Sequence, residues 1–108
     1  MDHLRVTTGR YDALTQRLVG TVLSTPGATP TELRRAVLER GQVPPPLASY
    51  VDKVARHAYT VTDADVAALA QAGYSEDAIF EITVSAAVGA ALNRLERGLA
   101  ALRGEESD

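Results

Sequence analysis

The chain contains no cysteine and no tryptophan, and aromatic residues make up only 5% of it. Without a thiol it cannot form a disulfide, a thiolate nucleophile, a zinc–thiolate site or a cysteine-ligated iron–sulfur cluster. The chain does not begin with a basic segment followed by an apolar run, and no stretch approaches the ~20 apolar residues of a membrane span. We therefore expect a cytoplasmic protein with no signal peptide and no membrane partner.

An excess of positive charge is also missing. The 108 residues include 14 acidic and 11 basic side chains, which give a formal net charge of −3. A phosphate backbone is bound by a basic face, so the sequence predicts no nucleic-acid partner. No cluster of residues has the spacing of a metal site, and we expect neither a metal nor a cofactor.

Alanine and leucine supply much of the apolar content, which is 45% of the chain. Such a composition favours helices over sheets. Apolar spacing and stop signals predict about five helices in a single all-α domain spanning residues 1–108. An N-terminal helical pair is expected over residues 8–41, a stiff proline-rich connector over 42–46 and a helical body over 47–103.

Several residues are typical of helix boundaries. The run Thr29-Pro30-Thr31-Glu32 predicts a capping box for a short helix that ends at Gly41. Thr62 and Ser75 are expected to cap two later helices, because acidic residues follow each of them in the first turn. Gly73, between these two helices, is expected to end the first one in a left-handed conformation.

The last predicted helix reaches Leu102 and would exceed 40 Å at ~1.5 Å per residue, which is long for one small domain. It therefore either bends near Gly89 or projects towards a partner. Small residues over 85–91 predict close contacts with neighbouring helices. Leu95, Leu99 and Leu102 form a narrow apolar seam beyond them, which predicts a homo-oligomer assembled through the C-terminal helix.

Three segments carry a family resemblance: VTDADVAAL at 61–69, AGYSEDAI at 72–79, and an alanine-rich helix that ends in LNRL at 92–95. Together they resemble the C-terminal half of the alkylhydroperoxidase D and carboxymuconolactone decarboxylase superfamily, over roughly residues 47–102. The resemblance implies an alkylhydroperoxidase D-like helical domain in dimers, trimers or hexamers. Redox members carry a Cys-x-x-Cys-x-x-x-His motif, which a cysteine-free chain lacks, so peroxidase activity is not implied.

Two functions remain open. The preferred one is a non-redox helical oligomer, acting as an accessory protein that binds a small molecule or another protein. The alternative, left open by the resemblance, is a cofactor-free lyase or isomerase of carboxymuconolactone decarboxylase type. In that enzyme His57 would be a general base oriented by the carboxylate of Glu81.

Each candidate residue also has a simpler explanation. His57 could be a partly exposed histidine near a helix C-terminus, where a cation is favoured. Glu81 could face solvent or form a buried ion pair with an arginine. The charged run Asn93-Arg94 with Glu96 and Arg97 is most simply a helix surface or an interface between subunits.

The segment from Thr62 to Leu92 also has the layout of a helix-turn-helix. Its second helix, however, opens with Glu76 and Asp77, which would repel DNA phosphates. A three-helix ubiquitin-associated-like module around Gly73-Tyr74 is a further possibility, although the long apolar last helix exceeds what that fold needs.

Overall fold

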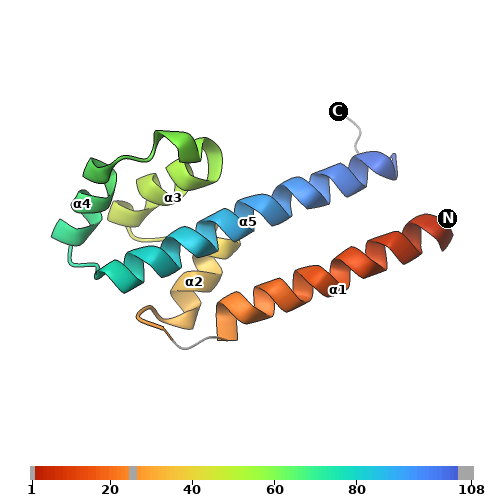
Figure 1. Cartoon of the computed structure of the whole chain (residues 1–108), viewed down its shortest axis with the longest axis horizontal. Coiled ribbons are helices and arrows are strands. Elements are labelled where there is room, and N and C mark those ends of the chain that lie inside the picture. The colour runs from red at the N-terminus through yellow and green to blue at the C-terminus, as the bar shows by residue number, and fades with distance from the viewer. Residues whose placement is uncertain (1, 25–26, 105–108) are drawn as a thin grey trace.

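The computed structural model describes the backbone of residues 2–24 and 27–104, and side chains from residue 12 onward within these ranges. Over this part of the chain it contains five α-helices, one 3-10 segment and no strand, which confirms an all-α fold of five helices. The elements are α1 (Asp2–Ser24), α2 (Thr31–Leu38), α3 (Pro45–His57), η1 (Ala58–Thr60), α4 (Asp63–Gln71) and α5 (Glu76–Leu102) (Figure 1).

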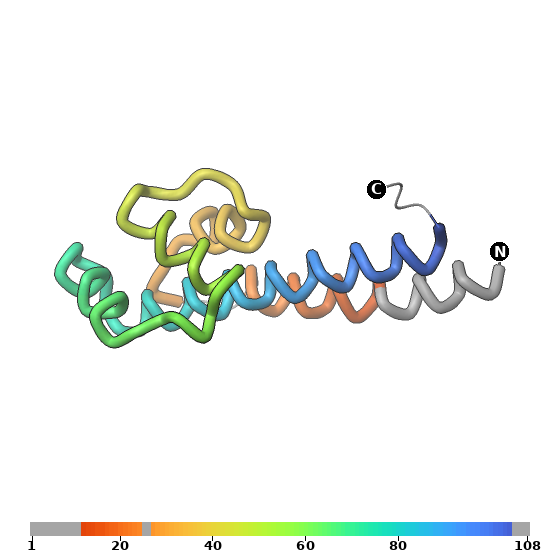
Figure 2. The backbone as a smooth tube through the Cα atoms, turned by 90° about the horizontal axis from the view of Figure 1, so that it is seen from above, coloured from red at the N-terminus to blue at the C-terminus, as the bar shows by residue number. Residues whose placement is uncertain are grey.

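The central element is α5, which contacts each of the other four α-helices. Its first half lies against α2, α3 and α4, which form the body of the molecule (Figure 1). Its second half leaves this body together with α1, which runs alongside in the opposite direction (Figure 2). We call this projection the arm and define it as residues 12–19 of α1 and 92–102 of α5.

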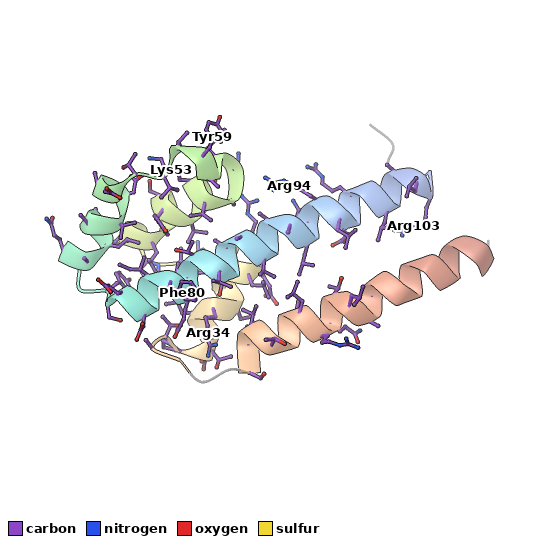
Figure 3. The ribbon with its side chains drawn as sticks, in the orientation of Figure 1. Arg34, Lys53, Tyr59, Phe80, Arg94 and Arg103 are labelled. Carbon is purple, nitrogen blue, oxygen red and sulfur yellow. The ribbon has the colours of Figure 1, made fainter. Side chains whose placement is uncertain are left out.

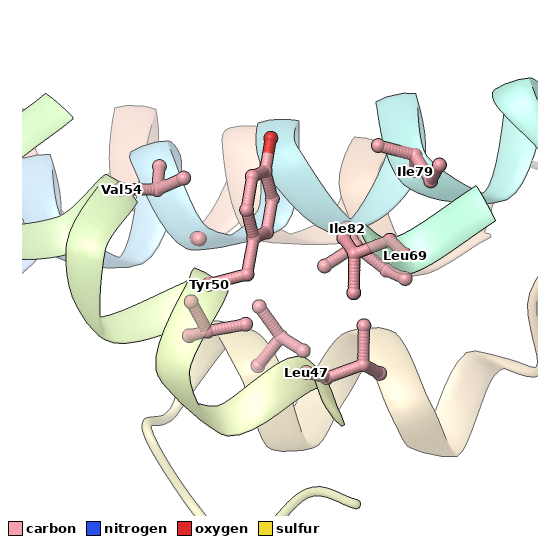
Figure 4. Packing of buried hydrophobic residues seen from close by; sticks show 9 residues of the cluster. Leu47, Tyr50, Val54, Leu69, Ile79 and Ile82 are labelled. Atoms are coloured by element: carbon pink, nitrogen blue, oxygen red, sulfur yellow. The ribbon is translucent and has the colours of Figure 1, made fainter. Parts of the chain in front are cut away.

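The core lies between α2, α3, α4 and the first half of α5 (Figure 4). Leu47 and Ile82 are fully buried, and Leu69 is almost so. The cluster of buried residues consists of Val37, Leu47, Tyr50, Val51, Val54, Leu69, Ile79, Ile82 and Ala86. Burial of each large aliphatic side chain stabilises the fold by about 1.5–3 kcal/mol, so these helices hold together without covalent or metal cross-links among the described residues.

The hydroxyl of Tyr50 enters this core, and it is paired. The hydroxyl of Tyr50 lies 2.7 Å from Oγ1 of Thr83. The Thr83 hydroxyl donates to the carbonyl oxygen of Ile79, also at 2.7 Å. Thr83 has a single hydroxyl proton, so Tyr50 must be the donor in the first bond. The chain of bonds satisfies the phenol and fixes α3 against α5.

The expected caps around α4 and α5 are confirmed. The Thr62 hydroxyl accepts from the backbone N–H of Asp65, whose carboxylate accepts in turn from the Thr62 N–H, which is a reciprocal capping box. Ser75 accepts from the backbone N–H of Ala78 at the start of α5. Gly73 has a φ of 105°, a left-handed conformation that costs little without a Cβ.

The boundaries expected further upstream are partly wrong. α1 begins at Asp2, well before residue 8, and α3 begins at Pro45, so the stiff connector does not reach residue 46. Pro45 fits the first turn of a helix because the N–H it lacks has no partner there. The expected capping box does not form either, since Pro30 is the N-cap of α2 without a side-chain bond, and the Thr29 hydroxyl binds elsewhere.

The small residues of α5 behave in two ways. Gly89 is buried, and a Cβ placed there would clash with the carbonyl group of Leu38, so the C-terminal end of α2 touches the α5 backbone. Ala87, which we expected in a close contact as well, is exposed. α5 continues as one helix through Gly89, and it projects beyond the body (Figure 1).

α5 is also long and apolar enough to cross a bilayer, by length and composition alone. The expectation that no stretch approaches a membrane span is therefore not met. Only 39% of the apolar window is buried in the molecule. Part of its apolar character serves the core, to which Ile79, Ile82 and Ala86 belong.

Candidate functional site

Glu81 lies on α5 opposite the loop that joins α1 to α2. Its carboxylate accepts hydrogen bonds from the backbone N–H of Ala28 at 2.7 Å and of Thr29 at 2.9 Å. The Thr29 hydroxyl adds a third bond at 2.6 Å. A Cβ on Gly27 would meet the same carboxylate, so a larger residue there would have to displace the end of the Glu81 side chain. Glu81 therefore anchors the loop to α5.

These bonds set the charge state of Glu81. The Thr29 hydroxyl is the largest influence and lowers the pKa of the Glu81 carboxyl, burial opposes it, and the N–H groups of Ala28 and Thr29 with the positive charge of Arg34 lower it further. A carboxylate held ionised by three donors is a poor proton carrier near neutral pH. The geometry gives Glu81 a structural role.

His57 is exposed at the last position of α3. Its ring makes an edge-to-face contact with Tyr59, with ring centroids 6.1 Å apart, and Tyr59 is itself 86% exposed (Figure 3). The His57 carbonyl oxygen accepts from the Thr60 hydroxyl at 2.7 Å, which shapes the turn after α3. This placement matches the simpler explanation, a histidine at a helix C-terminus.

The structure does not bring the two predicted catalytic residues together. The described contacts of Glu81 are with the α1–α2 loop, and those of His57 are with Tyr59 and Thr60. A general base needs a second group that orients it and an enclosed place for substrate. The described contacts of His57, with the Tyr59 ring and the Thr60 hydroxyl, supply no group that orients its ring as a base. Groups of acidic and histidine side chains that could hold a metal ion are absent from the described part of the chain.

Lys53, which precedes His57 by one turn, has a different partner. Its ammonium group lies 2.9 Å from the carboxylate of Asp65, and this bond is the main reason that the pKa of Asp65 is lowered. The pair connects α3 to the capping box of α4. The charged groups around His57 therefore hold helix ends in place.

Arg94 has a comparable role on the other side of α3. Its guanidinium donates to the carbonyl oxygen of Ala55 at 3.0 Å, in the last turn of α3. Such carbonyls have no partner inside the helix, so the arginine satisfies one of them. The charged run that begins at Asn93 is exposed, and one member of it docks α3 onto α5.

The arm exposes leucine side chains from both of its helices. The exposed fractions are 50% for Leu14 and 43% for Leu18 on α1, and 36% for Leu95 and 73% for Leu102 on α5. Side chains of both helices point into the space between them (Figure 3). Because these leucines remain partly exposed, the two helices cover only part of each other's apolar surface along the arm.

Their spacing is that of a helix–helix seam. Val88, Leu92, Leu95, Leu99 and Leu102 follow one another at steps of four, three, four and three residues. This alternation is the heptad pattern of coiled-coil interfaces, and Leu14 and Leu18 of α1 are one turn apart in the same way. The sequence predicted a partner seam on the last helix, and its helical periodicity also places Leu14 and Leu18 on one stripe of α1.

No family model, no curated protein and no solved structure matches this chain. The resemblance to the alkylhydroperoxidase D and carboxymuconolactone decarboxylase superfamily therefore stays a prediction.

Proposed function

We propose that this chain is a non-redox helical binding protein that assembles from two copies through the arm. The observation that carries the proposal is the exposed leucine seam on both helices of the arm. An isolated pair of helices gains little from such a seam, whereas two arms packed against each other would bury all four exposed leucines of each chain in a four-helix bundle.

The elongated shape of the molecule supports an arm whose surface is meant for a second copy. Its radius of gyration is 15.8 Å, and its longest extent is 52 Å. A compact domain of this length has a radius of gyration of about 13 Å. The arm accounts for the excess length, and it holds apolar residues where a solvated helix would carry polar ones.

A second copy suits this surface better than an unrelated helix does. In a two-fold dimer the same surface of each copy forms the interface, so the two leucine seams of one arm pack against the same two seams of the other. Each helix of the arm carries both signs of charge, Asp12 and Arg17 on α1 and Glu96 and Arg97 on α5. Two identical arms can therefore pack together without placing only like charges opposite each other.

The other expectations have less support. The cofactor-free lyase lacks an assembled site, because His57 and Glu81 are engaged with different parts of the molecule. The alkylhydroperoxidase D-like architecture is consistent with five helices and a central apolar one, but many helical domains share these features. The proposal rests on the arm and not on that family.

Sedimentation equilibrium tests the proposal. At micromolar concentration the wild-type chain should have twice the 11.5 kDa mass of one copy. The double variant Leu14→Lys/Leu102→Lys places a charge on each helix of the arm and should sediment as a monomer with an unchanged helical circular dichroism spectrum.

Phe80→Lys is the matched control. Phe80 is 69% exposed on the first half of α5, away from the arm, so its replacement also removes an exposed apolar group (Figure 3). This variant should remain a dimer. A wild-type monomer, or a dimer that the arm variant leaves intact, would overturn the assignment of the interface.

A further inference from the structure

A groove lies between the end of α3 and the middle of α5. Its volume is about 580 Å³, within the range of sites that hold small molecules. Arg94 lies in it, on α5 beside the end of α3 (Figure 3). Its lining consists of Arg40, Ala55, Arg56, Ala90, Asn93, Arg94 and Arg97.

Small residues produce the hollow. Ala55 of α3 and Ala90 of α5 are both buried, and each has only a methyl group where a larger side chain would fill the space. The other lining residues of these two helices are polar, Arg56 on α3 and Asn93, Arg94 and Arg97 on α5, so the groove has an apolar floor and a polar rim. The small residues of α5 thus shape this groove in addition to allowing close packing.

The rim is strongly basic in a chain of net negative charge. Four of the eleven basic residues of the protein line this one groove, and none of the lining residues is acidic. Asp52 is the only acidic residue with a described bond to the rim, 2.9 Å from Arg56 and 3.7 Å from Arg40. One carboxylate faces two guanidinium groups, and Arg94 binds a neutral carbonyl, so most of the positive charge is left uncompensated.

Arg40 reaches the groove from an unfavourable backbone conformation. It has a φ of 60°, and it is the only residue other than glycine with a positive φ in the part of the chain described. The N–H of Gly41 donates to the carbonyl oxygen of Ala36 at 2.7 Å, which completes a Schellman motif around Arg40. A glycine is usual at this position of the motif. An arginine at this position places a positive charge at the groove, although the backbone conformation there favours glycine.

We infer that this groove binds a small molecule with two adjacent phosphate groups. The four guanidinium groups come from three different elements, and each presents a fork of donors that matches phosphate oxygens. A phosphate group directs its oxygens to several sides at once, whereas a carboxylate has two oxygens in one plane. The uncompensated charge of the rim fits the charge of a diphosphate, and the remaining volume leaves room for an organic part.

Isothermal titration calorimetry with inorganic pyrophosphate tests this, on the full chain and at fixed ionic strength because salt screens such contacts. We expect one pyrophosphate per chain and clearly weaker binding of citrate, a carboxylate of similar charge. Arg97→Gln should weaken pyrophosphate binding roughly tenfold, the effect of removing one charged hydrogen-bond donor. Arg97 is exposed, so this variant should keep its fold.

Arg35→Gln is the matched control, since it removes an exposed arginine of α2 outside the groove. It should bind pyrophosphate like the wild type. Absence of binding at millimolar pyrophosphate, equal binding of citrate, or equal weakening by both variants would overturn the inference. Asn93, Arg94 and Arg97 belong to both the groove and the arm, but no exposed leucine of the arm lines the groove. A wild-type chain that sediments as a monomer and binds pyrophosphate would therefore refute the dimer and leave the groove assignment intact.

Discussion

Single side chains hold the helix ends of this protein in place, and Glu81 is the clearest case. It lies in an apolar stretch of α5, but its carboxylate is tied to three donors of the α1–α2 loop. Removal of an acceptor leaves those donors without a partner, which costs more than the hydrogen bonds themselves contribute. The residue expected to carry chemistry instead fixes a loop.

Glu81→Gln should therefore lower the free energy of unfolding by about 1–3 kcal/mol at pH 7, because the amide group turns a donor towards the loop N–H groups. The folded-state pKa of Glu81 is lowered, so its contribution is complete above the unfolded pKa near 4.3 and is lost as the pH falls through the folded value. Urea unfolding at several pH values should show the difference between variant and wild type shrinking below about pH 4.

Glu32→Gln is the control for this experiment, since it removes an exposed carboxylate from the first turn of α2. Its effect should be a few tenths of a kcal/mol, that of a favourable charge near a helix N-terminus. A constant difference between Glu81→Gln and wild type down to pH 3 would contradict the role assigned to the carboxylate.

Arg40, unlike Glu81, is a residue that we expect to cost stability. A left-handed conformation costs about 1–2 kcal/mol for a residue with a Cβ, and glycine avoids most of this cost. Arg40→Gly should therefore raise the free energy of unfolding by up to about 1 kcal/mol, because the exposed ion pair with Asp52 contributes little. The same variant should bind pyrophosphate more weakly. A less stable variant would show that the ion pair outweighs the backbone strain.

At the scale of elements, the contact between the end of α2 and the middle of α5 decides how the body packs. Gly89→Ala should destabilise the protein by about 1–3 kcal/mol or more, because the added methyl group meets the backbone carbonyl of Leu38 and not a movable side chain. Thermal unfolding followed by circular dichroism measures this directly.

Gly20→Ala supplies the comparison. Gly20 lies in α1 with no atom within 4 Å of an added Cβ, so alanine there should stabilise the helix by roughly 0.5–1 kcal/mol. The two variants make the same chemical change with opposite expected signs. Equal effects would mean that α2 does not rest on the α5 backbone.

For the whole molecule, association through the arm would link stability to concentration. If two copies associate, mass action favours the folded dimer, and the midpoint of thermal unfolding should rise with protein concentration. The midpoint of Leu14→Lys/Leu102→Lys should not depend on concentration. Scans over a hundredfold range of concentration would separate the two cases, and a constant wild-type midpoint would count against association through the arm.

The sequence by itself determined the local features. Helical periodicity predicted five helices, and Thr62, Ser75 and Gly73 marked the boundaries of α4 and α5 because capping depends on neighbours within one turn. The absence of cysteine excluded thiol chemistry without any reference to the fold. The seam at Leu95 and its successors was also visible, since a heptad is a pattern along one helix.

The tertiary structure decided what distant residues do to one another. Thr29 had the signature of a local cap, but Glu81, 52 residues away, offers its hydroxyl a charged acceptor, and that bond forms in place of the cap. The arginine groove was equally hidden, because Arg40, Arg56 and Arg97 are far apart in the chain and meet only where α3 ends on α5. Periodicity assigns a residue to a face of its own helix, and only packing decides which other element meets that face.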